Sequence, residues 1–216
     1  MAEPDDHQHD HEHDHDHDGH DHDHEHEHEH VHEDEELSEA AEEREREHVR
    51  RHAIAQIRQY PDAALRMKAK EVVEFDPYLM QLVERMITLM VDAQGVGLAA
   101  TQVGVLQRVF VFELEGEGTK AVVNPRLVDR SSETETEEEG CLSLEGIRVP
   151  VERAAKVTVE GVDPSGEEVR LELEGLSARV VQHETDHLDG VLIIDRTDAE
   201  HRAEALGQLR PQTVLR

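Results

Sequence analysis

Residues 182–187 read QHETDH, a stretch that places His183 and His187 four positions apart. On an α-helix, residues four apart share one face, so both imidazoles can reach a single metal ion. Glu184, directly after the first histidine, can then approach a water at that ion and act as a general base. This stretch predicts a helix that carries a metal-dependent hydrolytic site.

The pattern HExxH is weak evidence by itself in this chain, because it also begins at residues 11, 24, 26 and 28. Those four copies lie in a segment of alternating His and acidic residues, with almost no apolar side chains to hold a rigid helix. The copy at residue 183 is framed by apolar residues, Ala178, Val180, Val181 and Leu188. Since a catalytic site needs a packed platform, this copy is the predicted site.

Two imidazoles leave a metal ion without a third protein ligand, and the sequence offers three places to look for one. The position used by metzincin proteases is occupied here by Ile193, which cannot ligate. A thermolysin-like arrangement would use Glu200 or Glu204 on a following helix. The third candidate is Cys141, whose thiolate binds Zn²⁺ or Fe²⁺ strongly. Spacing alone leaves the glutamates and the cysteine open.

Three segments appear in a fixed order along the chain: GVGLAATQ at 95–102, EGCLS at 139–143 and QHETDH at 182–187. Together they resemble the peptide deformylase family, whose patterns are GxGLAAxQ, EGCLS and QHExDH. The resemblance covers about residues 55–196 and favours Cys141 as the third ligand. The chain departs from the family at Glu145, where a proline is common, which concerns the shape of that loop.

The resemblance implies a role for eight residues. They are the metal ligands Cys141, His183 and His187, the catalytic residues Glu184, Gln102 and Leu142 (through its amide), and the substrate-binding residues Gly97 and Arg148. The side-chain NH₂ of Gln102 and the N–H of Leu142 would stabilise an oxyanion.

The implied reaction is removal of the formyl group from N-formyl-methionyl peptides, releasing formate, on newly made polypeptides near the ribosome. The family typically works with Fe²⁺. Two His and one Cys also suit Zn²⁺, Ni²⁺ or Co²⁺, so the ligand set does not choose the ion. A family member that binds without catalysis is an alternative, which the intact candidate residues disfavour.

Composition limits the other function classes. The 216 residues suit one domain, and the net charge of −30 argues against nucleic-acid binding, which needs Lys and Arg. The single cysteine permits no intramolecular disulfide and fits a reducing compartment. No signal-peptide pattern and no apolar run of about 18 residues are present. We therefore expect a cytoplasmic protein with no membrane segment.

The charge is concentrated at the N-terminus, where residues 1–48 hold 22 acidic residues and two arginines. We predict that residues 1–36 form a disordered tail, because they have too few apolar side chains to repay ordering. The alternating His and acidic residues can bind extra divalent metal ions, so a rival function is metal buffering by the tail. Residues 37–53 are predicted as a charged helical lead-in, and 54–216 as the catalytic domain.

The remaining pattern predicts an α+β fold. A helix is expected over 76–94, strands over 108–112 and 121–123, and a hairpin from 156–160 and 169–173. A C-terminal helix is predicted to start at Thr197 in a capping box. The predicted architecture is mixed or antiparallel β-sheets around a central HExxH helix, with N-terminal helices and a C-terminal helix.

Overall fold

The computed structural model describes residues 26–209, with side chains from residue 39 onward. Helix α1 spans His26–Ile54. The structure gives residues 26–36, which the prediction placed in a disordered tail, as part of this helix. Glutamate is a strong helix former, and a helix satisfies its backbone hydrogen bonds without a tertiary partner. The rest of the predicted tail, residues 1–25, lies outside the described residues.

The body of the protein begins within α1, since residues 44–216 form one compact unit. Ala53 and Ile54, at the end of α1, are only 2% and 7% exposed and belong to the core. A short 3₁₀ helix, η1 (Ala63–Arg66), follows. The end of α1 is thus fixed by apolar packing.

Helix α2 (Pro77–Asp92) confirms the helix predicted over 76–94. Asp76 is its N-cap and accepts a hydrogen bond from the N–H of Leu79 at 3.0 Å. Pro77 occupies the first helical position, where no N–H is needed. The apolar positions repeat every three or four residues, so one face is buried, formed by Leu79, Val83, Met86, Leu89 and Met90.

A five-stranded antiparallel sheet forms the centre of the body, in the order β1-β2-β3-β6-β7. Its strands are β1 (Gly97–Ala99), β2 (Val109–Leu114), β3 (Gly118–Arg130), β6 (Lys156–Val162) and β7 (Glu168–Glu174). The predicted hairpin is confirmed, with Val157 paired to Leu173 across β6 and β7.

Strand β2 is buried on both faces, which explains its continuous run of apolar residues. Side chains alternate along a strand. Val109 and Val111 pack in the cluster that contains α2, whereas Phe110 and Phe112 pack in the cluster that contains helix α3 (Gly175–Leu188). The sheet therefore lies between α2 and α3, and α3 is the helix that carries QHETDH.

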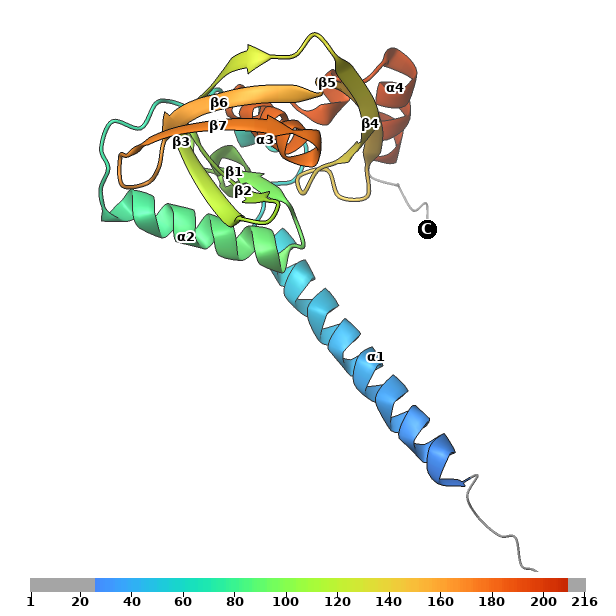
Figure 1. The fold of residues 1–216 in the computed structure, drawn as a ribbon. Helices are drawn as coiled ribbons and strands as arrows, with labels where there is room; N and C mark the ends of the chain where they lie inside the picture. Colours follow the sequence, from blue (N-terminus) through green and yellow to red (C-terminus); the bar gives the residue numbers. More distant parts are fainter. Residues whose placement is uncertain (1–25, 210–216) are drawn as a thin grey trace, which may run out of the picture. The chain divides into compact units, whose positions relative to one another are not determined.

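A second sheet pairs β4 (Thr134–Gly140) with β5 (Arg148–Ala154). Its apolar side chains share a cluster with η3 (Ile193–Asp195) and helix α4 (Ala199–Gln208). Helix α3 contacts strands of both sheets (Figure 1). The predicted α+β class and the central position of the HExxH helix are confirmed.

The N-cap of α4 lies one residue after the predicted one. Asp198, not Thr197, is the N-cap, and its carboxylate accepts hydrogen bonds from the N–H groups of Glu200 and His201. Both residue types cap helices well, so sequence could not separate these neighbours. Within the described part of the chain, no helix combines the length and apolar character that crossing a bilayer requires.

Candidate active site

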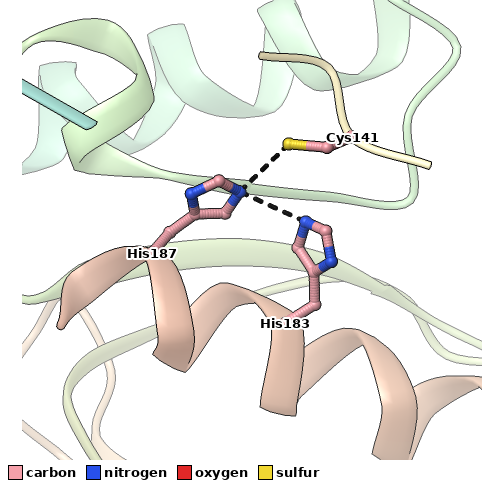
Figure 2. Close-up of side chains that lie close together, drawn as sticks. All are labelled: Cys141, His183 and His187. Atoms are coloured by element: carbon pink, nitrogen blue, oxygen red, sulfur yellow. Dashed lines mark hydrogen bonds between the residues drawn. The ribbon is translucent and has the colours of Figure 1, made fainter. Parts of the chain in front are cut away.

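Helix α3 presents His183, Glu184 and His187 from one side, because residues 183 and 187 are one turn apart. Cys141 follows the last residue of β4 and faces them. Its Sγ lies 3.2 Å from Nε2 of His187, and that nitrogen lies 3.2 Å from Nε2 of His183 (Figure 2). The structure thus brings together the three ligands implied by the sequence.

These three residues fit a divalent ion. Their donor atoms all lie within 4.8 Å of one another, and they form the one such three-residue group found among the described residues. Donor atoms that share an ion at about 2.0–2.3 Å are typically about 3–4 Å apart. Two imidazoles and a thiolate are also the donor types that Zn²⁺ and Fe²⁺ accept in proteins.

The rival third ligands do not join this group. Glu200 and Glu204 are both exposed on α4, whereas His187 is 1% exposed. Ile193 is buried in the cluster that the second sheet shares with η3 and α4, and it has no donor atom. A thermolysin-like arrangement is therefore wrong for this chain.

Glu139 orients the imidazole ring of His183 through Nδ1, the ring nitrogen that does not face His187. Oε2 of Glu139 lies 3.1 Å from that nitrogen. The carboxylate is buried and receives two hydrogen bonds of 2.9 Å from Arg153 and one of 2.8 Å from Arg179. A carboxylate in this position fixes the ring and leaves Nε2 free to bind a metal. Burial raises the pKa of Glu139, but the hydrogen bonds from His183 and Arg153 outweigh it, so this group stays ionised.

Arg153 extends the network to α3 and beyond. It pairs with Asp186 at 2.5 Å, and Asp186 also receives two hydrogen bonds from Arg196. Each buried charge therefore has an opposite charge beside it, as burial requires. The network ties β4, β5 and η3 to the metal-binding face of α3.

The pKa values of the two histidines are shifted in opposite directions. Burial lowers the pKa of His183, but hydrogen bonds with Cys141 and Glu139 raise it well above the ordinary value. Burial and the neighbouring charge of His183 hold the pKa of His187 well below its ordinary value. A proton is thus favoured on His183 and disfavoured on His187.

Glu184 is 3% exposed, and its Oε2 has no hydrogen-bond partner among the described residues. Burial raises its pKa to about 7, opposed by the charge of His183. A carboxyl group with this pKa can accept and return a proton near neutral pH. The unpartnered oxygen is available for a water or a substrate atom.

Gly97 of β1 lies directly against Glu184. A Cβ at this position would come within 2.8 Å of Val180 Cγ1 and 2.9 Å of Glu184 Cδ, closer than real contacts allow. Only glycine leaves room here for the carboxylate of the general base. Because Gly97 has no side chain, the backbone of β1 is also accessible from the cleft.

Gln102 lies in η2 (Ala100–Val103), directly after β1, and is 1% exposed. Its Oε1 accepts a hydrogen bond from the N–H of Ala99 at 2.8 Å. This bond points Nε2 toward Ser143 Oγ at 3.1 Å and Cys141 Sγ at 3.8 Å. The amide NH₂ therefore faces the candidate metal position.

Leu142 follows the cysteine, and its carbonyl accepts a hydrogen bond from Gln59 Nε2 at 2.8 Å. The hydrogen bonds found between described residues include none from the Leu142 N–H. The carbonyl of Cys141, which shares a peptide plane with the Leu142 N–H, accepts a hydrogen bond from the Leu144 N–H at 3.0 Å, so the Leu142 amide is held in one orientation beside Cys141.

One cleft of about 560 Å³ connects these residues. Glu184, Gln102 and Cys141 line it, as do both predicted substrate-binding residues, Gly97 and Arg148. The structure therefore places all eight predicted residues in or beside one site, with His187 buried below it.

Sequence reasoning gave no role to Glu139, Arg153 or Asp186. Glu139 was visible as the first residue of EGCLS, directly before Gly140 and Cys141. Asp186 was likewise visible as the fifth residue of QHETDH. Arg153 had no sequence signal of its own, because its partners Glu139 and Asp186 lie 14 and 33 residues away along the chain.

Comparisons with known proteins agree with this geometry. The family model described as polypeptide deformylase matches residues 54–203. The chain is 50% identical over 146 residues to the peptide deformylase of Thermotoga maritima, covering 68% of this chain and 88% of that protein. It is 48% identical over 158 residues to the enzyme of Acidothermus cellulolyticus, covering 73% and 87%.

Solved structures give the same result. The crystal structure of the Thermotoga maritima peptide deformylase matches with a TM-score of 0.64 and 51% identity, over 66% of this chain and 96% of that one. The Synechococcus elongatus peptide deformylase, solved in complex with actinonin, matches with a TM-score of 0.68 and 38% identity, over 70% and 85%.

Proposed function

The chain belongs to the peptide deformylase family, which removes the formyl group from N-formylmethionine of new polypeptides, and on that basis we propose which residues carry the reaction. We assign Cys141, His183 and His187 as metal ligands and Glu184 as the proton carrier. Gln102 and the Leu142 amide stabilise the oxyanion.

The family is metal-dependent, and we propose Fe²⁺ as the ion, with Zn²⁺, Ni²⁺ or Co²⁺ as substitutes. The cysteine-bearing ligand set supports this group of borderline ions over Mg²⁺ or Ca²⁺, which prefer oxygen. Such an ion, when bound, supplies Lewis-acid chemistry that lowers the pKa of water. Glu139 supports it by holding the ring of His183.

Glu184 takes the proton from the attacking water and gives it to the nitrogen of the departing amine. Its pKa of about 7 and its unpartnered oxygen support both halves of this transfer. As water adds to the formyl carbon, negative charge grows on the formyl oxygen. We assign Nε2 of Gln102 and the N–H of Leu142 as the donors to that oxygen; the position of Nε2, 3.8 Å from Cys141 Sγ, supports this assignment. Breaking of the C–N bond then leaves formate and a free amino terminus.

The cleft accounts for a preference for the formyl group. Gly97 brings β1 so close to Glu184 that a formyl hydrogen fits where a larger acyl group has little room. We propose that Gly97 lets the substrate backbone approach and that Arg148, exposed in the cleft lining, contacts the peptide beyond methionine.

The assignment depends most on one observation, the meeting of Cys141 with His183 and His187 next to an unpartnered Glu184. The test is formate release from formyl-Met-Ala-Ser by anaerobically prepared protein. Glu184→Gln keeps the size of the side chain but cannot carry the proton, so we expect its rate to fall by about 10²–10⁴. Equal rates for both proteins would refute the role of Glu184. No formate from either would refute the function and favour a family member that binds without catalysis.

A second proposal concerns the tail, residues 1–36. Its alternating His and acidic residues support binding of extra divalent ions, at many weak sites. We propose that the tail is accessory to a catalytic domain of 54–216, joined by the lead-in at 37–53. Deleting residues 1–36 should lower the number of ions bound and leave formate release intact. Loss of formate release on deletion would favour metal buffering as the main function.

We also propose that the protein acts in the cytoplasm, close to the ribosome. The chemistry of the substrate supports this, because a formylated amino terminus belongs to a chain that has just been made. The free thiol at the metal site supports a reducing compartment.

A further inference from the structure

Arg50 lines the cleft although it lies outside the part of the chain that matches the family model, which begins at residue 54. Its Nη2 is 3.2 Å from a carboxylate oxygen of Glu145, 95 residues away in sequence. Glu145 is the position where the EGCLS segment departs from the family pattern. An appended residue therefore contacts an unusual residue at the edge of the cleft.

Packing holds Arg50 in this place. Residues three and four apart on a helix share a face, so Arg50 lies on the same face of α1 as Ala53 and Ile54. Both of those side chains are buried in the core. The Glu47 carboxylate, one helical turn earlier, lies 3.8 Å from the Arg50 guanidinium and forms a second ion pair with it.

The contacted segment is the loop from Cys141 to Ile147, which carries the candidate ligand and the Leu142 amide. Its beginning is held by the Gln59 side chain on the Leu142 carbonyl and by the Tyr60 N–H on the Ser143 carbonyl at 2.9 Å. Its middle is held by Leu144, which is fully buried.

The tip of the loop, Glu145 and Gly146, has less support. Gly146 has φ +77°, and apart from its chain neighbours no described residue lies within 4 Å of where its Cβ would be. The Glu145 side chain is 48% exposed, and among the described residues its ion-pair partner is Arg50. The Ile147 N–H donates a hydrogen bond to the Leu144 carbonyl at 3.1 Å, which closes the turn, and without the proline that commonly stiffens this position the ion pair adds the side-chain contact of the tip.

The pair lines the solvent-accessible part of the cleft, since the side chains of Arg50 and Glu145 are 28% and 48% exposed. The reacting formyl group must lie beside Cys141 and Glu184, at the buried end. Residues of the peptide beyond methionine then extend toward the lining side chains that remain accessible, which include Arg50, at 28%, and Glu145. The ion pair is therefore placed along the later part of the peptide.

We propose that Arg50 is a positioning residue for this enzyme: through Glu145 it holds the loop tip in the conformation that binds the extended part of the formyl-peptide. The inference rests on the proposed function of the cleft. Because the pair is remote from the reacting atoms, it acts on substrate binding and leaves the chemical step unchanged.

The test measures kcat and KM of the full-length protein on formyl-Met-Ala and on a formylated hexapeptide. The variants are Arg50→Glu, Glu145→Arg and the charge-exchanged double variant. Arg51→Glu is the matched control, because Arg51 also approaches Glu47 but does not line the cleft. An exposed ion pair supports an increase in hexapeptide KM of about threefold for each single variant.

We expect kcat and the KM of formyl-Met-Ala to stay at wild-type values, and the double variant to recover the hexapeptide KM. High salt should raise the wild-type hexapeptide KM and leave that of Arg50→Glu unchanged, because salt screens an exposed pair. An unchanged hexapeptide KM in Arg50→Glu, an equal effect of Arg51→Glu, or no recovery in the double variant overturns the inference. No formate release by the wild-type chain overturns the proposed function instead.

Discussion

Replacing Gly97 with alanine tests the arrangement of the site with a single methyl group. The new Cβ would lie 2.8 Å from Val180 Cγ1 and 2.9 Å from Glu184 Cδ. Ordinary contacts between such atoms are about 3.5–4.0 Å, so the neighbours must move by about 1 Å. Val180 belongs to a packed cluster, whereas one oxygen of Glu184 has no partner, so we expect the carboxylate to move.

A displacement of about 1 Å of a catalytic group lowers the rate by about 10². We therefore expect kcat/KM of Gly97→Ala on formyl-Met-Ala-Ser to fall by about 10²-fold. Overpacking costs about 1–3 kcal/mol, which lowers Tm by a few degrees in a domain of this size. The metal should stay bound, because none of the closest atoms belongs to Cys141, His183 or His187.

Gly207→Ala is the matched control, since outside its own helical turn a Cβ on this α4 residue meets no described atom within 4 Å. We expect unchanged activity and slightly higher stability from better helix propensity. A Gly97→Ala enzyme with kcat/KM within threefold of the wild-type value would refute the claim that this glycine makes room for Glu184. Loss of metal in Gly97→Ala would show that the methyl group disturbs the ligands rather than the base.

Four further predictions concern the ligands, their support and the fold. Cys141→Ser should abolish the thiolate-to-metal charge-transfer band of the Co²⁺-loaded protein, a band that histidines of the tail cannot produce; its persistence would exclude the cysteine as a ligand. Glu139→Gln should weaken Co²⁺ binding by about 10–100-fold in a chelator competition followed by the same band, and unchanged affinity would remove its role in orienting His183. Gln102→Leu should lower kcat by about 10²–10³ while the band remains, and a wild-type kcat would leave Leu142 as the only oxyanion donor of the two proposed. Asp76→Ala should lower the free energy of unfolding by about 1 kcal/mol through loss of the α2 cap, with activity unchanged; wild-type stability in thermal melts would contradict the importance of that cap.

Local patterns predicted the helices and strands well where one signal dominated. Asp76-Pro77 fixed the start of α2, and period-two alternation identified β6 and β7. Prediction failed where two neighbours carried equal signals, as Thr197 and Asp198 did at the start of α4. Residues 26–36, predicted as part of a disordered tail, are helical in the structure, because helix propensity without burial leaves little trace in a hydrophobic pattern.

The site could be predicted in part, for a similar reason. Residues 183–187 share a helical turn, so their common direction follows from helix geometry. Cys141 lies more than 40 residues away, and spacing left Glu200 and Glu204 equally open. The resemblance to a family favoured the cysteine before any coordinates did, and the structure then brought the three donor atoms together.

By itself, the sequence determined the chemistry of this protein: which donors are present, that two of them share a helical turn, and that the reaction belongs to the deformylases. Only the tertiary structure decided what surrounds those donors. Glu139 contacts Nδ1 of His183, and Gly97 packs against Glu184. Arg50 forms an ion pair with Glu145. None of these pairs is close in sequence. The physical reason is that orientation and burial depend on strand pairing and helix packing, which bring distant residues together and leave no mark on local pattern.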